Sequence, residues 1–117
     1  MKEEYQAVML NIHFGENDRW QGKPLHAAIV AKCEELGLTG AIVYRGIEGY
    51  GTSTRVRRAG SLWKFSRDAP VMVSVVDSEE QIGRLIPHLD AMVGEGVIAA
   101  TPVRVMRYSR TEEKRSA

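Results

Sequence analysis

The chain has little cysteine and no long apolar run, and both absences narrow its class. Cys33 is the only cysteine among 117 residues, so an internal disulfide is excluded and a reducing compartment is favoured. No apolar stretch approaches the roughly 20 residues of a membrane-spanning helix. The first residues, MKEEYQ, are acidic, whereas a secretion signal needs a basic start and an apolar run. We therefore predict a cytoplasmic protein that is not embedded in a membrane.

An excess of charge of either sign is also lacking. The 16 Lys and Arg residues are balanced by 15 Asp and Glu residues, which leaves a net charge of +1 at pH 7. Clustered cations in the middle of the chain would allow contacts with phosphates. The near-neutral total and the lack of a recognisable nucleic-acid-binding motif nevertheless argue against a nucleic-acid partner.

The sequence also lacks a recognisable catalytic or metal-binding arrangement. Its three histidines do not have the spacing of metal ligands, and one cysteine adds no second soft ligand. No serine, histidine and carboxylate set and no close carboxylate pair has an acid–base rationale. We therefore predict a protein that is not an enzyme, with no metal and no required cofactor. His13, close to Glu16 and Asp18, is the best remaining candidate for metal or proton chemistry.

Hydrophobic periodicity predicts six elements in the order strand, helix, strand, strand, helix, strand. Ser78 and Gln81 have the spacing of a capping box at the start of the second helix. Pro87 should remove a hydrogen bond from that helix or kink it, and Thr101-Pro102 should interrupt the last strand. The expected elements cover residues 5–14, 24–36, 40–48, 71–76, 78–93 and 97–108.

This βαββαβ order predicts an α+β, ferredoxin-like fold, in which a four-stranded antiparallel sheet carries two helices on one face. The other face should be polar in a monomer, but the strand at 71–76 is apolar on both sides. Ala7 and Met9 add apolar side chains to the second side of the first strand. Because a large exposed apolar face implies a partner, we predict a homo-oligomer that packs these open faces together.

Three glycines follow the second strand, in the stretch RGIEGYG at residues 45–51. Gly46, Gly49 and Gly51 can expose backbone N–H groups as an anion-binding nest. They can equally form a bulge and a tight bend where the strand leaves the sheet. The turn at residues 94–96, GEG, has the same two interpretations, a helix stop or a ligand contact.

A long loop at residues 50–67 follows these glycines, and a loop of this length in a compact domain is commonly functional. Aromatic and arginine side chains together are typical of binding surfaces, although cations also keep a loop soluble and an aromatic ring can pin it to the protein's own core. The candidate partner-binding residues are Arg55, Arg57, Arg58 and Trp63.

Four strings resemble one family: PLHAAIV at 24–30, LTGAIVYRGIEGYG at 38–51, PVMVSVVDSEEQI at 70–82 and VGEGVI at 93–98. It is the domain-of-unknown-function family numbered 190, grouped with the PII-like signalling proteins. The resemblance covers about residues 5–108. It implies a PII-like ferredoxin fold and a homotrimer, but no agreed biochemical activity.

The wider PII-like resemblance implies a nucleotide or other small anionic effector in the cleft between subunits. It also implies that the loop at 50–67 docks on a transporter or an enzyme. One departure is Val97, because nitrogen-regulatory PII proteins have a phosphate-holding lysine after the glycine turn. The ligand-binding positions that the resemblance implies are Arg45, Gly46, Gly49, Gly51, Gly94, Glu95, Gly96 and Arg107, with Arg104 as an alternative to Arg107.

Residues 1–110 are expected to form one domain and residues 111–117 a flexible tail. The leading hypothesis is a trimeric PII-like regulatory protein that binds a small anionic metabolite or nucleotide and signals through the loop at 50–67. The alternative is an oligomeric adaptor or structural subunit without an effector. A third interpretation is a small enzyme or metal binder that uses His13.

Overall fold

The fold was analysed in a computed structural model, which describes residues 1–49 and 68–110. The loop at 50–67 and the tail at 111–117, with the expectations placed on them, lie outside the described residues. The elements in chain order are β1 (Lys2–Gly15), β2 (Arg19–Trp20), β3 (Lys23–Pro24), α1 (Leu25–Leu36), β4 (Ala41–Arg45), β5 (Pro70–Asp77), α3 (Glu79–Met92) and β6 (Val97–Tyr108).

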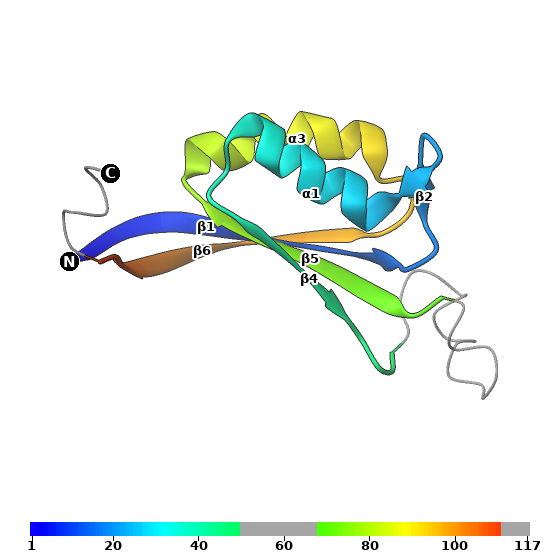
Figure 1. Cartoon of the computed structure of the whole chain (residues 1–117), viewed down its shortest axis with the longest axis horizontal. Coiled ribbons are helices and arrows are strands. Elements are labelled where there is room, and N and C mark those ends of the chain that lie inside the picture. Colours follow the sequence, from blue (N-terminus) through cyan, green and yellow to red (C-terminus); the bar gives the residue numbers. More distant parts are fainter. Residues whose placement is uncertain (50–67, 111–117) are drawn as a thin grey trace.

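The main sheet has four antiparallel strands in the order β4-β5-β1-β6. Both helices lie on one face of this sheet, and the other face carries no element of the described chain (Figure 1). This is the predicted α+β, ferredoxin-like arrangement, and the prediction of the fold is confirmed. The strands β4 and β6 form the two edges of the sheet.

The core lies between the sheet and the helices. Because side chains alternate between the two faces of a strand, Leu10 and Ile12 of β1 and Val73 of β5 point the same way and are fully buried. Ile29 of α1 and Leu85 of α3 close the core from above and are also fully buried. The apolar side chains that alternate along the sequence therefore point to the face of the sheet that the helices cover.

The helix ends follow their capping residues. Gly37 ends α1 in the left-handed conformation, with φ of 80°, which glycine adopts without steric cost. At the start of α3 the Ser78 hydroxyl accepts a hydrogen bond from the Gln81 N–H at 3.2 Å. The Gln81 side chain donates to the Gly37 carbonyl instead of reaching back to Ser78, whose N–H donates to the Asp77 carboxylate. The capping box is therefore half formed.

One local feature differs from the prediction. Strand β6 runs unbroken through Thr101 and Pro102, so the predicted interruption is wrong. The reason is that β6 is an edge strand, where a residue without an N–H can face away from the ladder. Helix α3 contains Pro87 and continues to Met92, in agreement with the expected helix at 78–93.

The stretch expected to be a polar connection contains a small hairpin, β2 and β3, joined by Gln21 and Gly22. Both turn residues have positive φ, 51° and 79°, as a two-residue hairpin turn of type I′ requires. The half-buried ring of Trp20 packs against the core. The hairpin therefore fastens the chain between β1 and α1 onto the helical layer.

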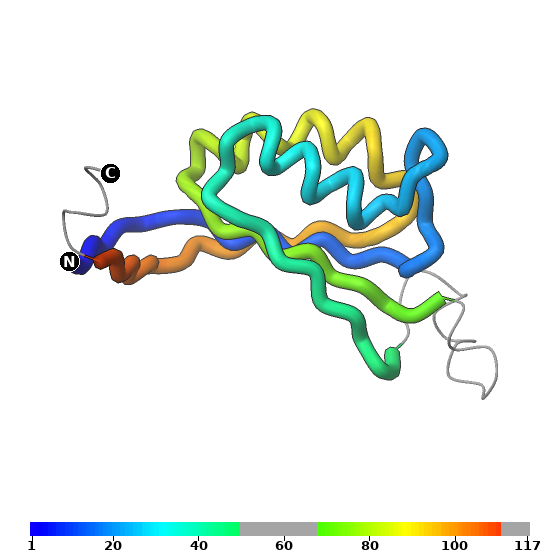
Figure 2. The backbone as a smooth tube through the Cα atoms, viewed as in Figure 1, coloured from blue at the N-terminus to red at the C-terminus, as the bar shows by residue number. Residues whose placement is uncertain are grey.

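The molecule is elongated, with extents of 51 × 27 × 27 Å. The cause is a two-stranded projection that we call the arm, formed by residues 2–7 of β1 and 103–108 of β6. Strand β5 pairs only with residues 8–15 of β1, so the arm extends beyond the helices (Figures 1 and 2). The Met1 amino group donates to the Ser109 carbonyl at 2.9 Å, which joins the two strands at the tip.

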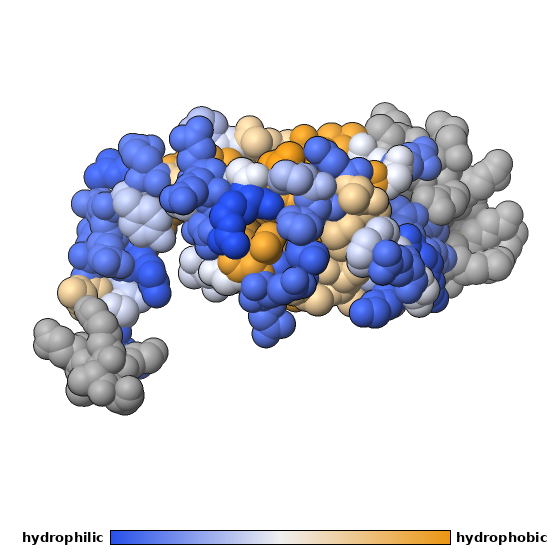
Figure 3. Space-filling view, turned by 90° about the horizontal axis from the view of Figure 1, so that it is seen from above, coloured by the Kyte–Doolittle hydropathy of each residue, from blue (hydrophilic) through white to orange (hydrophobic). Residues whose placement is uncertain are grey.

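The outer surface of the helical layer, which faces away from the sheet, is largely hydrophilic, with hydrophobic patches between the polar side chains (Figure 3). The arm is also mostly hydrophilic on this side of the molecule (Figure 3). Within the described ranges, no helix has the length and apolar character needed to cross a membrane.

Candidate functional site

Arg45 ends β4 at the point where the chain leaves the sheet for the predicted loop. Its guanidinium Nε lies 3.0 Å from the Glu16 carboxylate, and both side chains are partly exposed. The next residue, Gly46, donates its N–H to the Pro70 carbonyl at 2.7 Å. A Cβ atom on Gly46 would lie 2.8 Å from the Pro70 ring. Glycine at this position is therefore explained by the close approach of the Pro70 ring to the backbone of residue 46.

The other glycines of this stretch are less constrained. A Cβ on Gly49 would meet the Pro70 ring at 3.6 Å, which is an ordinary contact. Gly51 lies outside the described residues. Close packing against Pro70 thus accounts for the glycine at position 46 but not for the glycine at position 49.

The GEG turn, residues 94–96, joins α3 to β6. A Cβ on Gly96 would collide with the His13 carbonyl oxygen and would lie 3.4 Å from the Phe14 side chain. A Cβ on Gly94 would have no atom within 4 Å, and Glu95 is exposed. The two glycines therefore differ: the backbone of Gly96 packs against β1, whereas Gly94 faces open space.

Arg45 and the GEG turn lie at the same end of the sheet, which we call the loop end. Arg45 pairs with Val71 of β5, which pairs with Phe14 of β1, and His13 pairs with Val97 of β6. They nevertheless occupy opposite edges. Three strand spacings of about 4.8 Å put roughly 14 Å between β4 and β6.

Arg107 lies far from this end. It pairs with Glu3 in the arm, at the other end of the long axis, and Arg104 in the same arm forms an ion pair with Glu4 at 2.8 Å. The predicted ligand-binding residues thus occupy three places: the β4 edge, the β6 edge and the arm. One chain does not bring Arg107 to the other residues.

Two carboxylates at the loop end have roles that sequence reasoning missed. The buried Asp68 accepts a hydrogen bond from the Asn17 N–H at 3.1 Å, and Glu16 partially neutralises Arg45. The Glu16 N–H also donates to the Ala69 carbonyl at 2.8 Å. These contacts join the end of β1 to the residues that follow the loop at 50–67. The only sequence signal was that Asp68 is the single carboxylate after a run of cations.

His13 is exposed at the loop end of β1. Across the described ranges, no three His, Cys, Asp or Glu side chains gather as a group that could hold a metal ion. The structure thus gives His13 no neighbouring ligand set.

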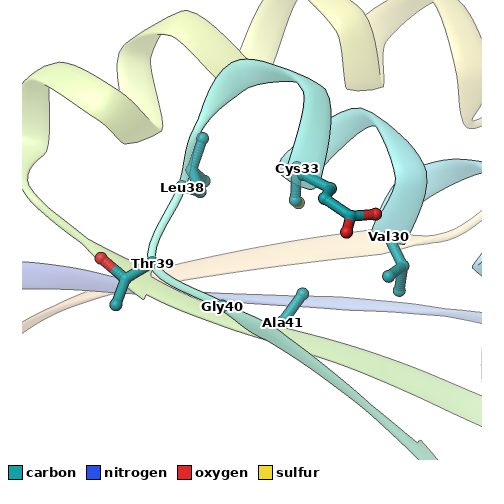
Figure 4. Close-up of a pocket in the computed structure, with 7 residues that line it drawn as sticks. Val30, Cys33, Leu38, Thr39, Gly40 and Ala41 are labelled. Carbon is teal, nitrogen blue, oxygen red and sulfur yellow. The ribbon is translucent and has the colours of Figure 1, made fainter. Parts of the chain in front are cut away.

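A separate surface pocket of about 260 Å³ lies between the end of α1 and the start of β4 (Figure 4). Its wall includes the buried Cys33, whose pKa is raised by desolvation, and raising a thiol pKa lowers its reactivity. None of the predicted ligand-binding residues contributes to it. The lining residues are Val30, Cys33, Glu34, Leu38, Thr39, Gly40 and Ala41.

The sheet face opposite the helices, called the open face below, carries large apolar side chains. Ile42 and Tyr44 of β4 are 57% and 49% exposed, and they pair with Ser74 and Met72 of β5. Directly paired residues of antiparallel strands share a face. The apolar second face that the sequence predicted is therefore present.

Comparison with known proteins gives the following matches. The sequence profile of the DUF190 family, described as "Uncharacterized ACR, COG1993", matches residues 7–105. A UPF0166 protein of Aquifex aeolicus is 32% identical over 98 residues, which cover 84% of this chain and 91% of that protein. A UPF0166 protein of Methanocaldococcus jannaschii is 32% identical over 103 residues, covering 87% and 94%.

Among solved structures, the fold is similar to that of CPII from Thiomonas intermedia K12 bound to ADP and bicarbonate. The TM-score is 0.61 at 20% identity, and the match covers 88% of this chain and 91% of that one. At this identity the similarity concerns the fold.

Proposed function

We propose that this chain, which belongs to the DUF190 family, is a PII-like regulatory protein. It forms a cytoplasmic homotrimer and binds a small anionic metabolite or a nucleotide at the clefts between subunits. It has no catalytic role, and it signals to a transporter or an enzyme through the loop at 50–67.

The observation that carries this proposal is the separation of the basic and glycine-rich positions. Arg45 and the GEG turn lie at the loop end, whereas Arg107 lies on the arm. A two-stranded ribbon alone is marginally stable in water, so the arm has reason to pack against another surface. An arm that packs against a neighbouring copy would bring a basic side chain to a cleft that one chain leaves incomplete.

The class of ligand follows from the charges at this cleft. Arg45, Arg104 and Arg107 are exposed cations, and the resemblance to PII-like proteins implies anion contacts at these positions. The similar fold of CPII was solved with ADP and bicarbonate, which supports testing both. Glu16 already pairs with Arg45, so an anion that binds there must displace this carboxylate.

The coupling to the loop follows from the contacts at its base. The Gly46 N–H, next to Arg45, donates a hydrogen bond to the Pro70 carbonyl on the far side of the loop. The Glu16 N–H donates a hydrogen bond to the Ala69 carbonyl. An anion that separates Arg45 from Glu16 would act on both connections. Because a ligand shifts only the states that it distinguishes, these two contacts are where bound and free states would differ.

The second candidate is an adaptor without an effector, and it has its own observation. Close packing against Pro70 and His13 already explains Gly46 and Gly96, and Arg45 already has an acidic partner. In that case the same trimer forms, but the cleft is occupied by the protein's own side chains.

The experiment combines light scattering with calorimetry on the intact protein. Light scattering should give about three times the chain mass of 13.0 kDa. ADP, AMP, ATP and bicarbonate are then titrated, alone and in pairs. Arg107→Ala should weaken binding at least tenfold, whereas Arg19→Ala, an exposed arginine on the β2 hairpin, should leave it unchanged. An intact trimer that binds none of these ligands would favour the adaptor.

A further inference from the structure

Asn11 lies in the middle of β1, an inner strand of the sheet. It pairs with Ser74 of β5 on one side and with Ala99 of β6 on the other. Its side-chain oxygen is shielded from solvent, and no hydrogen-bond donor among the described residues reaches it. A buried amide oxygen without a donor costs free energy, and native structures usually supply the missing partner.

The surroundings of this amide carry no charge: Ser74 and Thr101 are hydroxyl residues, and the other neighbours are apolar. By their pairing with β1, these neighbours of Asn11 lie on the open face: Met9, Met72, Val76, Ala99 and Thr101. The exposed Ile42 and Tyr44 continue the same surface on β4. An uncharged sheet face with exposed large apolar side chains is typical of a face that another molecule covers.

The charges of this face indicate a second copy of the chain as the occupant. Its charged residues, Glu3 and Arg107, lie opposite each other in the arm. From Tyr5 to His13 the strand presents no carboxylate, lysine or arginine to this side. A highly charged partner would have no oppositely charged side chains to pair with on this face. A second, identical and equally uncharged face would need none.

A carboxamide is complementary to itself, because its NH₂ group donates and its oxygen accepts. In the single chain the oxygen is covered by the chain's own atoms, so the amide must turn about its Cβ–Cγ bond to reach a neighbouring copy. Once it is turned, each Asn11 around a rotation axis can donate to the next copy and accept from the previous one. A single asparagine in an otherwise apolar interface can fix the register and the number of chains, at some cost in stability.

We infer that Asn11 sets the geometry of the subunit interface, through amide-to-amide hydrogen bonds between the open faces of identical chains. The inference rests on the trimer proposed above and adds the contact that selects it. Asn11 acts as a positioning residue, remote from the proposed ligand cleft.

The test uses Asn11→Asp and Asn11→Leu in the full chain, with Asn17→Asp as the matched control. Asn17 is the other asparagine of the sequence and is exposed in the connection after β1. Sedimentation velocity over a dilution series measures the protomer concentration at which half of the assembly dissociates, and circular dichroism checks that each variant is folded.

In Asn11→Asp, like carboxylates meet at the axis without counter-ions. The half-dissociation concentration should rise at least 100-fold at pH 8, because an uncompensated buried charge is strongly unfavourable. It should return toward the wild-type value at pH 5, where such carboxyls take up protons. His13 lies on the same face, so the wild type is measured at both pH values. Asn17→Asp should behave as the wild type.

Asn11→Leu tests the same idea without a charge. It should assemble at least as tightly as the wild type but give more than one size of assembly. Folded Asn11→Asp that assembles like the wild type at pH 8, or Asn11→Leu that forms a single trimer of unchanged affinity, would overturn the inference while leaving the proposed function intact. A monomeric wild type would instead remove the trimer on which both depend.

Discussion

Replacing Gly96 by alanine should destabilise the protein, and replacing Gly94 by alanine should not. The two positions lie in one turn and differ in their surroundings. An added Cβ at position 96 meets the His13 carbonyl oxygen, which belongs to the backbone of an inner strand and cannot rotate away. An added Cβ at position 94 meets nothing within 4 Å. Neither glycine has a positive φ, so the comparison isolates packing.

The magnitude follows from the cost of forcing atoms into a well-packed site, about 1–3 kcal/mol. For a chain of this size, 1 kcal/mol corresponds to about 4 °C in the melting temperature, so Gly96→Ala should melt roughly 4–12 °C lower. Gly94→Ala should stay within about 0.5 kcal/mol of the wild type, as is usual for exposed positions.

The assay is urea unfolding at one fixed protein concentration, because assembly makes stability depend on concentration. Equal stability of Gly96→Ala and the wild type, or equal losses in both variants, would refute the packing argument. Ligand titration of the same two proteins separates structure from function. A loss of ADP or bicarbonate binding in stable Gly94→Ala would assign that glycine to the ligand.

Glu16→Gln should strengthen anion binding about two- to fivefold in calorimetry, because an exposed ion pair contributes up to about 1 kcal/mol and its loss frees Arg45; weaker binding would show that Glu16 helps to hold the ligand. Ser78→Ala should lower the stability in urea by about 1 kcal/mol through loss of the α3 cap, and an unchanged midpoint would mean that Asp77 replaces it. Gly83→Ala, where an added Cβ meets no atom within 4 Å on exposed helix surface, should stabilise by about 0.5–1 kcal/mol; a lower midpoint would contradict this. Cys33, whose pKa is raised by burial, should react with iodoacetamide at pH 7.5 far more slowly in the native protein than in urea, and equal rates would show that the pocket exposes the thiol.

The fold was predictable because its signals are local. The alternation along β1 and the apolar stripes of both helices are patterns within one segment, and their order suffices for a ferredoxin-like sheet. The unbroken β6 was not predictable, because whether Pro102 can be accommodated depends on the edge position of its strand. The hairpin at Gln21-Gly22 was missed because Gln at positive φ is uncommon and the pair differs from the usual Asn-Gly signal.

The candidate site was predictable only as a set of positions. The sequence shows that Gly46 and Gly96 are glycines, but the atoms that require them belong to Pro70 and His13, which are distant in the chain. The ion pair between Arg45 and Glu16 joins residues that are 29 positions apart, and no pattern in the sequence predicts it. The distance of Arg107 from both glycine turns depends on the length of the arm. Its first strand begins at Lys2, whereas the pattern suggested a start at residue 5.

The bond between the Met1 amino group and the Ser109 carbonyl has a practical consequence for engineering. Residues 1 and 109 lie close enough to be linked, and exposed turns accept new chain ends. A permuted chain that joins residue 109 to residue 1 through a short glycine linker, and opens at Gln21-Gly22, keeps every strand of the main sheet. Its new ends lie beside α1, so a fluorescent or affinity tag can be attached away from the arm.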